Sequence, residues 1–269
     1  MRPRRPAHER RKTRNMLRVL TLNTHKGFSS FNRRFVLHEL RRAIRSSGAD
    51  IVFLQEVIGE HARKARKYVE WPAAPQHEFL ADEIWPEHAY GKNAVYRHGH
   101  HGNAILSRYP IVHSLKVDIS TNRVEQRGFL HCVMQLPGYP RLLHCVCLHL
   151  GLFSSSRRKQ LAMVAQYVEK AVPRDLPLII AGDFNDWTGA SNGAFGKALR
   201  LRDAAVETRG RKARTFPAWL PFLPLDRIYY RGLTATKSEI YNRDLWARLS
   251  DHAGLFAEVA LSPARAGAV

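Results

Sequence analysis

Apolar residues along this chain gather into short runs that match the length of β-strands, with turn residues between them. The first run covers Met16–Thr24 and is bounded by Gly27, and the run "ADIVFLQE" follows as a second buried strand. Further strands are predicted in "GNAILSRYPIVHSLKV", where a Tyr-Pro turn separates two of them, in the hairpin "RGFLHCVMQL" and "RLLHCVCLHL", and in "LPLIIAGDFN", "LDRIYYRGL" and "LSDHAGLFAEVAL".

Fewer segments carry the periodicity of a helix. After Asn32 as a predicted N-cap, apolar residues fall largely on one face until Gly48, which is a natural helix stop. Ser154–Ala171 has an amphipathic pattern, and a short helix is predicted near Gly193–Leu201. Strands interleaved with fewer helices predict an α/β sandwich built on mixed sheets.

Five of the apolar runs end in polar side chains. These residues are Asn23, Glu56, His149, Asp183 with Asn185, and Asp251 with His252. If neighbouring strands end at one edge of a sheet, their terminal side chains converge there, and sites of α/β folds commonly lie at such edges. Taken singly, an Asp or Asn at a strand end is often only a turn residue or a helix cap.

The residue types in this set point to phosphate chemistry. Glu56, Asp183 and Asp251 are hard oxygen donors without a cysteine partner, which suits Mg²⁺ or Mn²⁺. His149 and His252 titrate near working pH and suit proton transfer. Attack of water on a phosphate ester needs a metal, a base and amide donors together.

The composition of the chain bears on the size of the domain and, through its net charge, on the expected partners. The chain has 269 residues, 45% of them hydrophobic, which is enough for one catalytic-sized domain. Its formal net charge of +20 favours nucleic acid or an anionic membrane surface as a partner, although an arginine-rich proteome explains it as well. Residues 1–15 hold seven Arg or Lys and one Glu, and we expect them to be a disordered basic tail.

The apolar runs are far shorter than a membrane-spanning helix requires, and no secretory segment is visible. We therefore expect a soluble, cytoplasmic bacterial protein and a monomer. The cysteines, Cys132, Cys145 and Cys147, lie in strand-like apolar context without metal-site spacing, so we expect buried free thiols.

The order of the motifs resembles the endonuclease/exonuclease/phosphatase superfamily, which includes deoxyribonuclease I, exonuclease III, bacterial sphingomyelinases and inositol polyphosphate 5-phosphatases. The motifs are "LNTHKG", "LQE", "GNAILSRYPI", "RG", "HLG", "GDFND", "LDRIY" and "SDH", and they extend from about Leu17 to Leu261. Within the superfamily the chain is similar to a bacterial branch that shares "HKGF", "FNRRF", "GHHGNA", "LSRYPI" and "AGDFNDW". The resemblance implies a four-layered α/β sandwich with two packed mixed sheets, and a divalent metal.

The resemblance also implies a metal site and the groups that support it. Glu56 would be the principal metal ligand, helped by Asn23 and Asp251. His252 would act as a general base or phosphate clamp, oriented by Asp226 of "LDRIY".

The remaining implied roles concern water and the scissile phosphate. Asp183 would position the attacking water, while Asn185 and His149 would contact the phosphate. Arg127 matches a phosphate-side arginine. His149 stands where apurinic-site endonucleases carry asparagine, and is shared with deoxyribonuclease I, sphingomyelinases and tyrosyl-DNA phosphodiesterases.

Two segments leave alternatives open. "HGHHGN", residues His98–Asn103, suggests a metal site, but we interpret it as a glycine-rich loop in which Asn103 approaches phosphate. "TFPAWLPFLPLDRIYY" places Trp219 and Phe222 before Asp226, and its prolines forbid a regular helix. This loop either covers one end of a sheet or forms an apolar lip that stacks on bases or enters a bilayer.

Three functions follow as hypotheses for a catalytic domain over residues 16–262, with residues 263–269 as a C-terminal tail. The first is a metal-dependent nuclease that hydrolyses DNA or RNA. The second is a phosphodiesterase or phosphatase of the same fold acting on phospholipid or a small molecule. The third, from another class, is an inactive module that binds polyanions through charge.

Overall fold

The computed structural model describes residues 16–122 and 124–262, so both predicted tails lie outside the described residues. The described residues form two six-stranded sheets. Each sheet is mixed, because one parallel pair, β1 with β2 or β7 with β8, is flanked by antiparallel neighbours. The two-sheet α/β sandwich predicted from the sequence is confirmed.

The first sheet contains both ends of the described chain. Its strands in spatial order are β11 (Leu233–Tyr241), β12 (Gly254–Leu261), β1 (Met16–Asn23), β2 (Ile51–His61), β4 (Gly99–Ser107) and β3 (Glu87–Tyr96). The second sheet is formed from the middle of the sequence. Its order is β5 (Ile111–Asp118), β6 (Gly128–Met134), β7 (Leu143–His149), β8 (Leu178–Asp183), β10 (Asp226–Arg231) and β9 (Arg202–Asp203).

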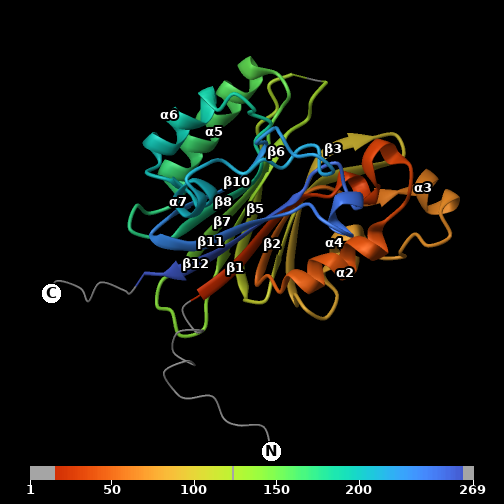
Figure 1. Cartoon of the computed structure of the whole chain (residues 1–269), viewed down its shortest axis with the longest axis horizontal. Coiled ribbons are helices and arrows are strands. Elements are labelled where there is room, and N and C mark those ends of the chain that lie inside the picture. The colour runs from red at the N-terminus through yellow and green to blue at the C-terminus, as the bar shows by residue number, and fades with distance from the viewer. Residues whose placement is uncertain (1–15, 123, 263–269) are drawn as a thin grey trace, which may run out of the picture.

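Helices cover the outer face of each sheet, and this gives the predicted four layers (Figure 1). Beside the first sheet lie α2 (Leu37–Ser47), α3 (Ala62–Lys67) and α4 (Gln76–Ala81). The second sheet carries α5 (Ser154–Ala171) and α6 (Ala190–Ala198) on its outer face, while α7 (Ala204–Arg209) packs against β11 of the first sheet and β9 and β10 of the second. Short 3₁₀ turns lie at η1 (His25–Gly27), η2 (Ser30–Asn32) and η3 (Trp246–Arg248).

Three apolar clusters hold the layers together. The central one joins the facing sides of the two sheets, with Val19 and Ile51 from one sheet and Ile179 and Ile228 from the other. A second cluster packs α2 and α4 on the first sheet, and a third packs α5 on the second. Burial of apolar area on this scale is the main favourable term in folding. The three cysteines are free and buried, as predicted.

Some local predictions were wrong. The helix after β1 begins at Leu37 rather than directly after Asn32, because residues 30–32 form a separate 3₁₀ turn; Gly48 ends the helix as predicted, with φ of 65°. The glycine-rich segment "GHHGN" is not a loop but the start of β4, paired with β2 and β3. None of the helices in the part of the chain that the structure describes is long and apolar enough to cross a bilayer.

Candidate active site

The ends of β7, β8 and β10 place three of the predicted residues side by side. His149 is paired with Asp183 in the parallel register of β7 and β8, and Asp183 is paired with Asp226 in the antiparallel register of β8 and β10. All three side chains are buried. The strand-end reasoning from the sequence therefore holds for this sheet.

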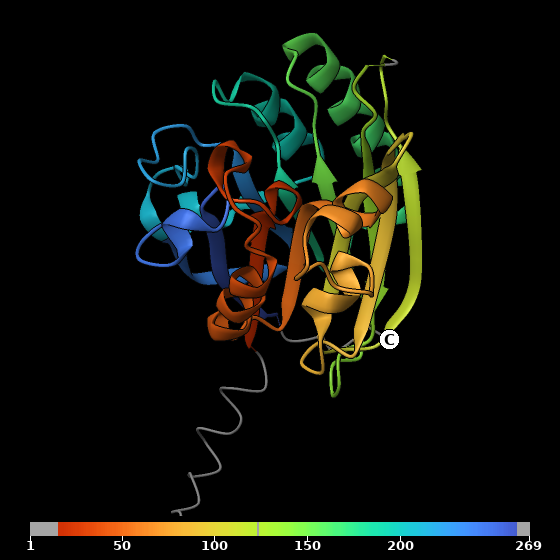
Figure 2. The same ribbon diagram turned by 90° about the vertical axis from the view of Figure 1, so that its right-hand side faces the viewer.

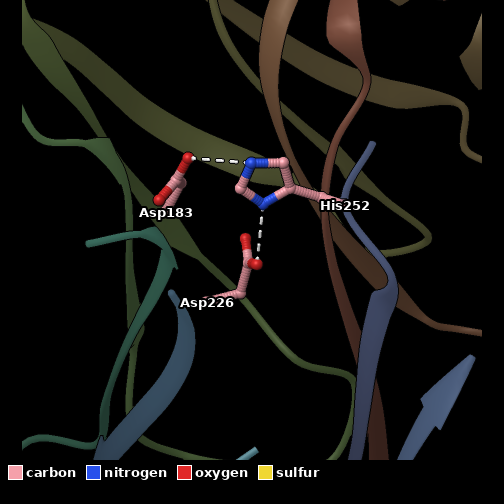
Figure 3. Close-up of side chains that lie close together, drawn as sticks. All are labelled: Asp183, Asp226 and His252. Atoms are coloured by element: carbon pink, nitrogen blue, oxygen red, sulfur yellow. Dashed lines mark hydrogen bonds and ion pairs between the residues drawn. The ribbon is translucent and has the colours of Figure 1, made fainter. Parts of the chain in front are cut away.

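His252, which precedes β12, lies between two of these carboxylates (Figure 3). Its Nδ1 is 2.9 Å from Oδ2 of Asp226, and its Nε2 is 3.6 Å from Oδ2 of Asp183. The hydroxyl of Thr215 donates to the same Asp226 oxygen at 2.5 Å. Because Asp226 accepts both bonds, the imidazole is held in one orientation, with Nε2 directed at Asp183.

This arrangement favours a protonated imidazole. Burial alone would lower the pKa of His252, but the charges of Asp226 and Asp183 outweigh burial and raise it to about 10. Burial raises the pKa of Asp183 to about 6, against the opposing effect of His252. The two groups are one coupled system in which a positive ring faces a carboxylate with raised proton affinity.

Asp183 is the most heavily contacted of these side chains. Its Oδ1 accepts from the backbone N–H of Asn185 at 2.9 Å, and its Oδ2 accepts from the side-chain amide of Asn23 at 3.2 Å. Nε2 of His149 is 3.5 Å from the same Oδ2. The side chain of Asn185 donates to the carbonyl oxygen of Leu150 at 2.9 Å. The bond from Asn23 joins the two sheets at the site.

Glu56 lies on β2, where the backbone leaves regular pairing. The register with β4 shifts between Leu54 and Val57, and Glu56 has φ of 56°, in the left-handed region. Its Oε2 is 3.2 Å from the ammonium group of Lys26. Burial would raise the pKa of Glu56, but the charges of His149 and Lys26 lower it to about 2. The bulge thus turns one ionised carboxylate toward the site.

The turn that carries Lys26 also contacts Asp251, through His25. Nδ1 of His25 is 3.1 Å from Oδ1 of Asp251. Burial would raise the pKa of Asp251, but the bond from His25 and the charge of His252 leave it lowered. The turn has φ of 45°, 59° and 79° at His25, Lys26 and Gly27, and this geometry directs two consecutive basic side chains at the two carboxylates.

Two residues predicted to lie beside the phosphate, Arg127 and Asn103, donate hydrogen bonds to backbone carbonyl oxygens of the protein. Arg127 donates from Nε to the carbonyl oxygen of Leu150 at 3.2 Å and lies 3.6 Å from Glu125. Asn103 is buried on β4 and donates to the carbonyl oxygens of Gly128 and Cys147, so its amide nitrogen serves to join the sheets. Its Oδ1 accepts no hydrogen bond from the described residues.

His149 links the Glu56 side of the predicted site to the His252 side. Burial and the charge of Arg127 lower its pKa well below the usual value, while Glu56 opposes them and His252 adds to them. Asn23, whose backbone pairs with Gln55 next to Glu56, donates to Asp183, and Asp183 also faces His252. Glu56 and His252 are therefore not separated by the fold.

The ligand atoms of Asp183, Asp226 and His252 all lie within 4.8 Å of one another, which would also suit a metal. We do not assign the metal there, because a metal-bound imidazole must present a lone pair and this ring is held protonated between two carboxylates. The spacing instead describes a histidine with its orienting aspartate.

Four residues of this site were missed in the sequence: Thr215, His25, Lys26 and His101. Thr215 directly precedes the hairpin closed by Phe216 and Leu223, and the basic pair belongs to a turn. His101 lies on β4, its charge lowers the pKa of Glu56, and its Nδ1 is buried without a partner among the described residues. The run of "GHHGN" directly into "AILS" was the signal that this segment is a strand.

Comparisons with known proteins bear on the family and the fold of this chain. Residues 20–252 match the sequence profile described as the Endonuclease/Exonuclease/phosphatase family. The chain is 47% identical over 244 residues to the Escherichia coli K12 protein YbhP, which covers 91% of this chain and 96% of that protein. A crystal structure of TDP2 from D. rerio in complex with a single-strand DNA product has a TM-score of 0.66 at 21% identity, covering 91% of this chain and 98% of that one.

A third similar protein acts on a different kind of substrate. The mannosyl-6-phosphatase Bt3783 of Bacteroides thetaiotaomicron has a TM-score of 0.67 at 18% identity, covering 91% of this chain and all of that one. At such identities the likeness concerns the fold. The fold is therefore shared by proteins whose substrates differ.

Proposed function

Because this chain belongs to the endonuclease/exonuclease/phosphatase family, whose members are generally phosphoester hydrolases, we propose that it is a divalent-metal-dependent phosphodiesterase. One observation carries the proposal: the His252 imidazole is fixed between Asp226 at 2.9 Å and Asp183 at 3.6 Å. A protein that only binds polyanions needs no buried ring with a raised pKa beside a second buried carboxylate. We assign the catalytic domain to residues 16–262.

The residues beside Lys26 fit a divalent cation. Glu56 is ionised, and among the described residues its Oε2 has no hydrogen-bond partner; its neighbour at 3.2 Å is the Lys26 ammonium group, which a cation can replace. Asn23 and Asp251 add oxygen atoms, so the donor set is hard and suits Mg²⁺ or Mn²⁺. A divalent ion bound there would supply positive charge to the phosphate oxygens and to the leaving group.

The surrounding residues divide the rest of the reaction. We assign Asp183 as the group that positions the attacking water and accepts its proton, because its pKa is raised to about 6. His252, held positive by Asp226, then serves as the phosphate clamp rather than as the base. We assign His149 and Asn185 to the other phosphate oxygens and Arg127 to the positive side of the site.

Two substrate classes have support. Nucleic acid is favoured by the net charge of +20, and a similar fold holds a single-strand DNA product in TDP2. Phospholipid is favoured by exposed Trp219 and Phe222 on a loop next to the site. Both substrates contain a phosphodiester group that carries one negative charge, so the same catalytic groups serve either one.

A substrate panel tests the proposal. The purified chain is incubated with plasmid DNA, an RNA oligonucleotide, phospholipid vesicles and the soluble ester bis(p-nitrophenyl) phosphate, each with Mg²⁺, with Mn²⁺ and with EDTA. We expect hydrolysis of at least one phosphodiester with metal, none with EDTA, and a large loss in His252→Ala. If folded protein hydrolyses none of these esters with either metal, the proposal is wrong.

A further inference from the structure

A hairpin beside the candidate active site exposes a group of large apolar side chains. Backbone hydrogen bonds between Phe216 and Leu223 close this hairpin, which we call the 216–223 hairpin. Contiguous exposed apolar surface is unusual on a protein without a partner and marks interaction sites. The exposed side chains at its tip are Trp219 at 62%, Leu220 at 59% and Phe222 at 56% exposure.

The hairpin is tied to the loop that carries the metal-side carboxylate. The N–H of Ala218 donates to the carbonyl oxygen of Asp251 at 2.8 Å. The segment after β1 is tied to the same loop, because the hydroxyl of Ser30 donates to the carbonyl oxygen of Ser250 at 3.2 Å. That segment exposes Phe31 at 76%. Whatever binds these apolar side chains is thereby held in a fixed relation to the site.

A groove of about 490 Å³ lies between the two segments. Phe31 and Trp219 line it together with Arg33, Arg34 and Arg248. Figure 2 shows the red segment after β1 next to the light-blue hairpin at the edge of the molecule. The groove therefore combines two exposed aromatic rings with three cations.

A second groove of about 700 Å³ lies on the other side, where Pro221 of the hairpin forms part of the wall. Among the described residues, none of its cations has a carboxylate oxygen within 4.0 Å, and Glu239 in the same groove is paired with Lys237 at 2.8 Å. Unpaired cations leave this wall attractive to anionic groups. The cations are Arg209, Arg211, Lys212, Arg214 and Arg243.

We propose that this face docks on an anionic phospholipid bilayer. Trp219, Leu220, Phe222 and Phe31 enter the interfacial region, and the cations of the two grooves contact lipid phosphates. An apolar tip bordered by cations is the arrangement that interfacial binding requires, since the apolar area and the attraction to anionic lipids add. Tryptophan in particular is enriched at the membrane–water interface.

The arrangement of the apolar residues favours a bilayer over a nucleic acid strand. Single-strand binding uses flat rings spaced along a basic groove, so that successive bases stack on them. Here the apolar side chains of the hairpin share one tight turn, and Leu220 offers no ring for a base. The five cations of the second groove share its wall with Pro221 and not with an aromatic ring of the hairpin.

Docking by itself does not depend on catalysis. Its consequence, that the substrate is a phosphodiester presented at a membrane surface, rests on the proposed function. The two can fail separately, because vesicle binding is measured without turnover and hydrolysis of bis(p-nitrophenyl) phosphate is measured without vesicles.

The test is cosedimentation of the full chain with vesicles of phosphatidylcholine alone or mixed with phosphatidylglycerol. The hairpin variant is Trp219→Ser with Phe222→Ser. The matched control is Val112→Ser with Leu115→Ser, which removes two exposed apolar side chains from β5 at the other edge of the second sheet. The basic residues 1–15 are present in every protein, so any attraction they contribute is constant.

We expect binding to anionic vesicles only, with an affinity about tenfold or more lower in the hairpin variant and unchanged in the control. Hydrolysis of the soluble ester should not differ between the hairpin variant and the original chain. Equal vesicle binding by the original chain and the hairpin variant overturns the proposal, as does absence of any preference for anionic vesicles. Loss of single-stranded DNA binding without loss of vesicle binding in the hairpin variant assigns the face to nucleic acid instead.

Discussion

The hydroxyl of Thr215 donates a 2.5 Å hydrogen bond to the Asp226 oxygen that also faces the His252 ring. Thr215 therefore acts on the site through Asp226. We predict that Thr215→Val, which keeps the shape of the side chain, costs about 1–3 kcal/mol of unfolding free energy, because it deprives a buried carboxylate of one donor. Hydrolysis should fall by roughly tenfold as the imidazole loses its fixed orientation.

Urea unfolding and steady-state kinetics measure these two effects. Thr234→Val, at an exposed position of β11, is the matched control and should change neither quantity. If Thr215→Val behaves like Thr234→Val in both assays, the hydroxyl has no positioning role.

Asp226→Asn tests what keeps the His252 ring charged. The amide retains the size of the carboxylate but removes its charge, so the pKa of His252 should fall from about 10 toward the usual value. The loss of the clamp should lower hydrolysis by about two orders of magnitude or more. NMR titration of the histidine ring signals follows the pKa directly. An unchanged His252 titration in the variant would show that Asp226 is not the main source of the shift.

The same pKa shift predicts how stability depends on pH. His252 has a folded-state pKa of about 10, above its ordinary value of 6.5, so the folded protein holds this proton more tightly than the unfolded chain. The contribution is complete below pH 6.5 and is lost as pH rises toward 10. The free energy of unfolding of the metal-free protein should therefore decrease as pH rises across this range. The decrease should be smaller in His252→Gln. Parallel stability curves for the two proteins would contradict this.

The sequence predicted most of the fold because buried central strands carry a strong apolar signal. The strands that escaped prediction, β3, β9 and β11, are edge strands of their sheets. In β11 only Leu233 and Ser238 are buried, and the other residues are half-buried or exposed in no regular order, so no continuous apolar run identifies this strand. Pairing with a neighbour, which the local pattern does not encode, makes these segments strands.

Site residues at the ends of strands could be predicted from the sequence, whereas site residues positioned by turns could not. His149 and Asp183 converge because a parallel register places them side by side. The ion pair of Lys26 with Glu56 depends on a turn in the left-handed region and on a bulge in β2. Such conformations result from tertiary contacts, and the residue types alone do not indicate them.

Asp183→Asn tests the assignment of the water-activating group. The original enzyme should lose activity as the pH falls through an apparent pKa near 6, because the protonated carboxyl cannot accept a proton from water. The variant should be slower by about two to four orders of magnitude and should lack this acidic limb. Asp175→Asn, on an exposed loop, is the control. A variant that keeps the acidic limb would assign the base to another group.

The central claim is that metal binding and phosphate chemistry belong to different side chains of one site. A single paired measurement tests this claim. Mn²⁺ affinity is measured by calorimetry, and hydrolysis of bis(p-nitrophenyl) phosphate is followed over a Mn²⁺ titration, for Glu56→Gln and His252→Ala. Glu56→Gln should weaken Mn²⁺ binding strongly, because a negative ligand is lost. His252→Ala should bind Mn²⁺ nearly as the original chain does while hydrolysis falls by about two to four orders of magnitude. Equal Mn²⁺ affinities and equal rates for the two variants would contradict the account.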